Sequence, residues 1–161
     1  MSPSDVSIIV TVKNEASSIG RLLDTLRSQT ISPSEVVIVD GGSTDGTLER
    51  IASHRPPLPI RLLIREGTNI SQGRNEAIRA AKGEIIASTD AGVRLVPHWL
   101  EELTRPLQED ASLDVVSGFF LPDPQTAFET ALGATVLPTE GEVDPQSFLP
   151  SSRSVAFRRE A

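Results

Sequence analysis

The sequence predicts an α/β fold in which a mainly parallel sheet is flanked by helices. Short runs of apolar, β-branched residues alternate along the chain with segments whose apolar residues repeat at helical spacing. The connections between them are short, and the run Val36–Val39 is apolar without interruption, as in strands buried on both faces. This alternation is typical of a parallel sheet with helices on both of its faces.

Each predicted element rests on a local pattern. Residues 6–12 are β-branched at almost every position, and an apolar stripe at 19, 22, 23 and 26 follows at helical spacing, with Ser17 or Ser18 as a candidate cap. Further strands are expected at 36–40, 60–64, 84–89 and 114–121, with a short last strand at 154–158. Further helices are expected at 48–52, 70–82, from Pro97 until Pro106 ends or kinks the helix, and at 127–134, whereas 138–150 is typical of a loop.

Composition narrows the classes of function. The 161 residues are enough for one domain with a hydrophobic core, and the net charge of −7 argues against a nucleic-acid partner, which would require a basic face. The absence of cysteine excludes disulfides and thiolate metal sites. No signal-peptide pattern opens the sequence, and no apolar run approaches the roughly 20 residues of a transmembrane segment. We therefore expect a soluble, cytoplasmic protein, for which peripheral membrane attachment stays open.

Polar side chains follow three of the predicted strands at their carboxyl ends. Residues 13–15 follow the first strand, Asp40 ends the second, and Asp90 follows the fourth. Because ligands bind at this edge of open α/β sheets, we expect these residues to converge on one crevice. Carboxylates accept hydrogen bonds, so they suit a base N–H, ribose hydroxyls or a divalent metal. A nucleotide diphosphate would need a cation, for which Arg74 and Lys13 are the nearest candidates in the sequence.

Each of these residues also has a purely structural interpretation. Asp40 and Asp90 both precede small residues and could each shape a turn by accepting from nearby backbone N–H groups. Ser43 or Asp45 could cap the helix that follows them, and Arg74 could be a solvated helix residue. The coincidence of several such residues at strand ends favours a ligand site over the structural interpretation.

Four segments together resemble family 2 glycosyltransferases, whose nucleotide-sugar-binding half has a Rossmann-like GT-A fold. They are Ile8–Glu15, Val37–Thr47, Gly73–Ile86 and Thr89–Gly92, in the order and spacing of the family. The resemblance is close over residues 6–121 and looser beyond. It implies one domain over 1–161, with the nucleotide-sugar-binding part at 1–121 and the start of an acceptor-side part at 122–161.

The resemblance also implies a reaction and a set of roles. The reaction is transfer of a sugar from a nucleotide-diphospho-sugar, of the UDP type, to an acceptor that the sequence does not identify, with inversion at the anomeric carbon. The implied roles are Thr11, Lys13 and Glu15 beside the base and ribose, Asp40 accepting from the base, Arg74 over the phosphates, and Asp90 near the ribose and a divalent metal (Mg or Mn).

Two departures from the family pattern bear on activity. Gly92 replaces the second aspartate of the D-x-D motif, which places metal dependence in question and leaves Asp90 as the candidate ligand. The family's catalytic carboxylate follows segments such as 151–161, so no base is assigned, and we expect it beyond Ala161 in a chain that is incomplete at its C-terminus. A non-catalytic nucleotide-sugar-binding module is therefore an alternative. A nucleotidyltransferase is disfavoured because no glycine- and lysine-rich phosphate loop follows the first strand.

Overall fold

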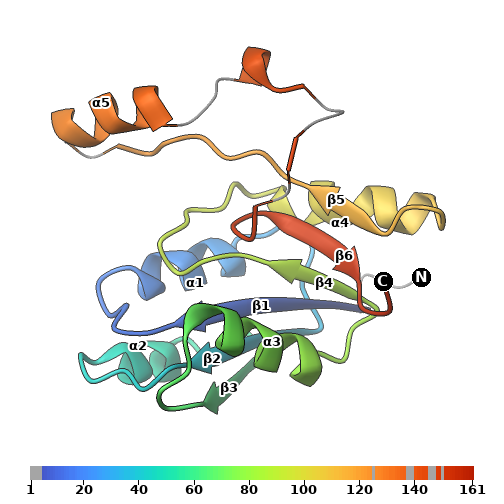
Figure 1. The fold of residues 1–161 in the computed structure, drawn as a ribbon. Coiled ribbons are helices and arrows are strands. Elements are labelled where there is room, and N and C mark those ends of the chain that lie inside the picture. Colours follow the sequence, from blue (N-terminus) through green and yellow to red (C-terminus); the bar gives the residue numbers. More distant parts are fainter. Residues whose placement is uncertain (1–4, 125, 137–139, 145–147, 150) are drawn as a thin grey trace.

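In the computed structural model, six strands form one sheet in the order β3-β2-β1-β4-β6-β5 (Figure 1). The structure describes residues 5–124, 126–136, 140–144, 148–149 and 151–161. Four neighbouring strands are parallel: β3 (Ile60–Ile64), β2 (Glu35–Asp40), β1 (Val6–Val12) and β4 (Ile85–Ser88). The predicted α/β class with a mainly parallel sheet is confirmed.

The last two strands correct the prediction of one simple alternation. The strand expected at 114–121 is shorter, β5 (Val115–Ser117), and it does not lie next to β4. Instead β6 (Val155–Arg158) inserts between them and runs antiparallel to both, so the sheet is mixed. The β6 pairing joins residues far apart in the sequence, and local periodicity carries no information about such a contact.

Helices cover both faces of the sheet, as predicted (Figure 1). On one face α1 (Ile19–Arg27) and α2 (Thr47–Ser53) share a core with the even-numbered residues of β1 and β2, and α4 (Trp99–Glu109) continues this core over β4, β6 and β5. On the other face α3 (Ile70–Ala80) packs on the odd-numbered residues through its small side chains. Successive strand residues thus point into two different cores, which explains the uninterrupted apolar sequence of β2.

Several helix boundaries differ from the predicted ones. The third helix ends at Ala80 rather than at 82, and the Asn69 side chain caps its start in a capping box with Gln72. Pro106 does not end α4, which continues to Glu109 because Leu107 is buried in the core.

The C-terminal part contains α5 (Ala127–Val136), which lies apart from the sheet in Figure 1. A 3-10 turn at Glu140–Glu142 falls within the predicted loop, whose residues 138–139, 145–147 and 150 lie outside the described ones. Within the described ranges, no helix is long and apolar enough to cross a bilayer.

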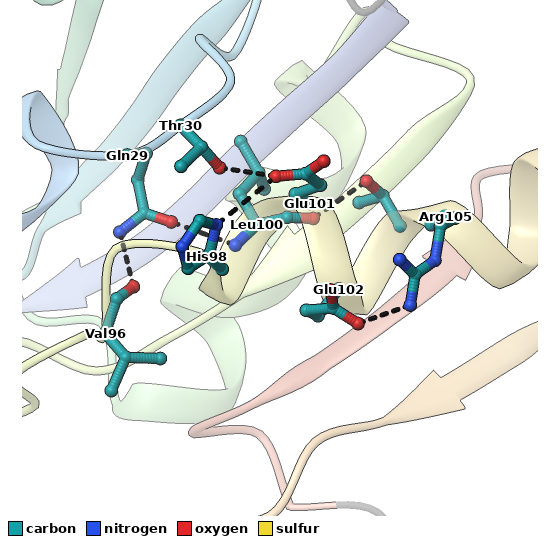
Figure 2. A network of polar contacts seen from close by, with 9 residues as sticks. Gln29, Thr30, Val96, His98, Leu100, Glu101, Glu102 and Arg105 are labelled. Atoms are coloured by element: carbon teal, nitrogen blue, oxygen red, sulfur yellow. Dashed lines mark hydrogen bonds and ion pairs between the residues drawn. The ribbon is translucent and has the colours of Figure 1, made fainter.

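A polar network fixes the start of α4 against the loop after α1 (Figure 2). The Gln29 side chain donates to the Val96 carbonyl (2.9 Å) and accepts from the Leu100 backbone N–H (2.9 Å). Thr30 donates its hydroxyl to the Glu101 carboxylate (2.7 Å), and this bond is the main reason that the pKa of Glu101 lies below its ordinary value. The network determines where the chain between β4 and α4 runs.

Replacing Gln29 by alanine should lower the free energy of unfolding by about 1–2 kcal/mol, because three backbone groups lose a partner: the Thr25 and Val96 carbonyls and the Leu100 N–H. Urea unfolding followed by circular dichroism measures the loss. The control is Gln108→Ala, at an exposed glutamine on α4. Equal stabilities of the two variants would contradict a structural role for the Gln29 network.

Candidate functional site

The loops that leave β1 and β2 are held together by side chains. Three consecutive backbone N–H groups after β1 donate to side-chain oxygens after β2. The pairs are Asn14 with Ser43 Oγ (2.8 Å), Glu15 with Thr47 Oγ1 (2.8 Å) and Ala16 with Asp45 Oδ2 (3.0 Å). In return, Asn14 Oδ1 accepts from the Thr44 backbone N–H (2.9 Å). We call residues 13–16 and 41–47 the loop clamp.

Asp40 organises the second half of the loop clamp. Its side chain is fully buried, and its Oδ1 accepts from the backbone N–H groups of Gly42 (2.8 Å) and Ser43 (2.9 Å). Its Oδ2 accepts from the Ser43 hydroxyl. These contacts agree with the turn-shaping interpretation, and they use three of the about four acceptor positions of a carboxylate. Recognition of a base by Asp40 stays a prediction.

Arg74 and Asp90 meet across the carboxyl edge of the sheet. Arg74 Nη2 lies 3.0 Å from Asp90 Oδ1, and the side chains are 23% and 28% exposed. Gly73 allows α3 to lie close enough to β1 for this contact. A Cβ at position 73 would lie only 3.2 Å from Thr11 Cγ2, so a larger residue would crowd β1. Helix α3 therefore passes close over β1, and Arg74 reaches Asp90, which lies shortly after the end of β4.

Of the other three predicted residues, Lys13 and Glu15 belong to the loop clamp and Thr11 lies just before it. Thr11 lies near the end of β1, and its buried Oγ1 has no hydrogen-bond partner among the described residues. Lys13 is exposed, and its Cδ lies 3.5 Å from the position that a Cβ on Gly41 would take. The Glu15 carboxylate accepts from the Ser18 hydroxyl, while the Ser18 side chain makes no capping bond to α1. Ser18 is the N-cap residue of α1, one of the two candidates predicted from the sequence, but its side chain does not supply a capping hydrogen bond.

A cavity of about 800 Å³ opens beside Asp90. Its walls come from the chain after β4, the start of α4, the segment after β5 and the chain before β6. The lining includes Asp90, Gly92, Trp99, Phe119, Phe120 and Arg153. Trp99 Nε1 donates to the buried Ser154 Oγ (2.9 Å), which joins α4 to the start of β6. Asp90 thus lines the cavity and also contacts Arg74 of α3.

Arg153 is absent from the residues predicted from the sequence, yet it lies at this site. Its Nε is 3.9 Å from Asp90 Oδ2, and its guanidinium carbon lies 5.3 Å from the centroid of the Phe120 ring. It reaches Asp90 because β6 pairs with β4, with Val155 opposite Ser88. No local sequence pattern announces that pairing.

The residues around Asp90 do not fit a divalent metal held by the protein. Gly92 offers no side chain, and the neighbours of Asp90 are two guanidinium groups. In the part of the chain that the structure describes, no group of three or more His, Cys, Asp or Glu side chains could hold a metal ion. A metal bound by Asp90, as tentatively predicted, would therefore find no second carboxylate at position 92.

Several known proteins resemble this chain. The family model for Glycosyl transferase family 2 matches residues 7–143. Validoxylamine A glucosyltransferase from Streptomyces hygroscopicus subsp. limoneus is 31% identical over 117 residues, which cover 70% of this chain and 26% of that protein. Mannosyltransferase PcManGT from Pyrobaculum calidifontis, solved with GDP-Man and Mn²⁺, is 29% identical with a TM-score of 0.71, covering 97% of this chain and 45% of that chain.

A third protein shares the fold. Glucosyl-3-phosphoglycerate synthase from Mycobacterium tuberculosis, solved with UDP, has a TM-score of 0.70 at 22% identity, covering 98% of this chain and 57% of that one. This chain therefore spans about a quarter of the curated relative and about half of each solved chain.

Asp40→Ala should lower the free energy of unfolding by about 1–3 kcal/mol, because the N–H groups of Gly42 and Ser43 lose their acceptor. Asp40→Asn retains one acceptor oxygen and should lose less. Chemical denaturation of both variants measures the difference. Wild-type stability of Asp40→Ala would contradict the organising role of this carboxylate.

We expect protonation of the Asp45 side chain to make the folded state less stable at acid pH than at neutral pH. The Thr47 hydroxyl, and then the Ala16 backbone N–H, lower the pKa of this exposed carboxyl in the folded state. Its stabilising contribution is therefore present above the unfolded pKa of about 3.9 and is lost as the pH falls through the lower folded value. Asp45→Asn should flatten the fall of stability below about pH 4, as measured by urea unfolding from pH 7 to 3. The control is Glu109→Gln, and parallel curves for wild type and Asp45→Asn would contradict the assignment.

Proposed function

We propose that this chain, which belongs to glycosyl transferase family 2, binds a nucleotide-diphospho-sugar whose sugar is transferred to an acceptor hydroxyl. The observation that carries the proposal is the Arg74–Asp90 pair, placed at the carboxyl edge of the parallel sheet between the loop clamp and the cavity. Residues 1–121 would hold the donor, and residues 122–161 would begin the acceptor side.

The donor would extend from the loop clamp towards the cavity. Its base and ribose would lie near the carboxyl end of β1, and its sugar would lie in the cavity. The proposed contacts are Thr11, Lys13 and Glu15 to the base and ribose, Asp40 through its remaining acceptor position to a uracil-type base, Arg74 to the phosphates and Asp90 to the ribose. A UDP donor is the first candidate, and GDP is the second because PcManGT was solved with GDP-Man.

The proposed reaction is a displacement at the anomeric carbon. The acceptor hydroxyl loses its proton to a base, and its oxygen forms a bond to the anomeric carbon. The bond from that carbon to the diphosphate breaks, and its electron pair goes to the diphosphate, so attack from the opposite face inverts the configuration. Fixed cations stabilise the charge that develops on the leaving group, and Arg74 is placed to do so.

Arg74→Ala should weaken UDP binding by about 10- to 100-fold, because a guanidinium contact to phosphate contributes on the order of 1.5–3 kcal/mol. Isothermal titration with UDP, and with GDP, measures the affinities. The control is Arg79→Ala, at a 70% exposed arginine of the same helix. Unchanged affinity in Arg74→Ala would contradict the phosphate role of Arg74.

Transfer itself distinguishes an enzyme from a binding module. Incubation of the full chain with labelled UDP-sugars should release UDP slowly by hydrolysis even without the natural acceptor. Nucleotide binding with no release of UDP above the background rate would favour the module.

A further inference from the structure

The charge around Asp90 differs from that of a metal-binding carboxylate pair. One carboxylate lies between two guanidinium groups, Arg74 on Oδ1 at 3.0 Å and Arg153 near Oδ2 at 3.9 Å. The three side chains together carry one net positive charge. A second carboxylate at position 92 would make the group neutral, but that residue is Gly92. Such a group attracts an anion and repels a free divalent cation.

Arg153 has donors to offer to such an anion. Its side chain is 53% exposed, and it makes no side-chain hydrogen bond to another described residue. The 3.9 Å separation from Asp90 is too long for a hydrogen bond, so the N–H groups of the guanidinium stay available. The Phe120 ring holds the guanidinium in place, and Phe120 in turn stacks with Phe119 at 6.4 Å between ring centroids.

Arg153 lies where the Arg74–Asp90 pair meets the cavity. Arg74 belongs to α3, which packs over β1 close to the loop clamp, whereas Arg153 lines the cavity together with Gly92 and Trp99. A diphosphate that runs from the loop clamp to a sugar in the cavity passes Arg74 first and Arg153 next. Arg153 then faces the phosphate that carries the glycosyl bond.

We propose that Arg153 binds the terminal phosphate of the donor diphosphate and, with Arg74, supplies the positive charge for which the protein offers no metal site. Guanidinium groups suit this role because their planar N–H donors match phosphate oxygens in pairs. Asp90 acts as a positioning residue that holds the two guanidinium groups side by side. The inference rests on the proposed function and deepens it.

The test compares UDP with UMP, which lacks the terminal phosphate, by isothermal titration in EDTA. Arg153→Ala should weaken UDP binding by about tenfold and UMP binding by less than about threefold, with Arg153→Lys intermediate. The control is Arg105→Ala, at a 51% exposed arginine of α4. Equal thermal unfolding midpoints of wild type and Arg153→Ala show that the variant is folded. Unchanged UDP affinity in Arg153→Ala overturns the inference.

A second experiment tests whether UDP binding depends on a metal ion, in the wild type and in Gly92→Asp. Wild-type UDP affinity should be the same within about twofold in EDTA and in Mn²⁺, because the arginines supply the charge. Gly92→Asp introduces a carboxylate where an added Cβ meets no atom within 4 Å. This variant should bind UDP more weakly in EDTA and regain affinity with Mn²⁺. Wild-type binding that EDTA abolishes and Mn²⁺ restores overturns the inference.

The outcomes separate the two proposals. If Arg153→Ala binds UDP like wild type, the role of Arg153 is wrong and the proposed function stands. If the wild type binds neither UDP and UMP nor GDP and GMP, the proposed function is wrong, and the inference is overturned with it. If guanine nucleotides bind more tightly, GDP and GMP replace UDP and UMP in the same comparison.

Discussion

The geometry of the site depends on the hydrogen-bond acceptors of the backbone N–H groups that follow β1. At the end of a parallel strand the chain leaves the sheet, and its N–H groups lose their ladder partners. The loop clamp supplies oxygens from Ser43, Thr47 and Asp45 in their place. Buried Asp40 fixes the turn that presents them. The positions of Lys13 and Glu15, and the start of α1, follow from this one set of bonds.

Close packing on both faces of the sheet then positions the residues around Asp90. Gly73 lets α3 pass against Thr11, and this approach brings a guanidinium to the end of β4. On the opposite face the Gln29 network fixes the start of α4, and with it the chain that lines the cavity (Figure 2). The Arg74–Asp90 pair and the cavity are therefore positioned by separate sets of contacts that meet at Asp90.

Two aspartates show how far the sequence could predict the site. Asp40 ends β2 and Asp90 lies just after β4, and both precede small residues, so both had the same two interpretations. In the structure Asp40 bonds to its own turn, whereas Asp90 contacts an arginine from another element. The alternation of strands and helices was predictable because each element has a local periodicity. The insertion of β6, and hence the place of Arg153, was not, because it arises from a pairing between distant segments.

The proposed anionic donor would meet positive charge at this edge of the sheet, although the chain as a whole is acidic. The net charge is −7, but Lys13, Arg74 and Arg153 gather near the carboxyl ends of β1 and β4, where Asp90 is the carboxylate between the two arginines. Two guanidinium groups this close repel each other, and Asp90 offsets that repulsion while no ligand is bound. A diphosphate brings further negative charge to the same place and can use the N–H groups that Asp90 leaves available. The carboxylate thus keeps the arginines together in the free protein, and the proposed anionic donor would take over part of that role on binding.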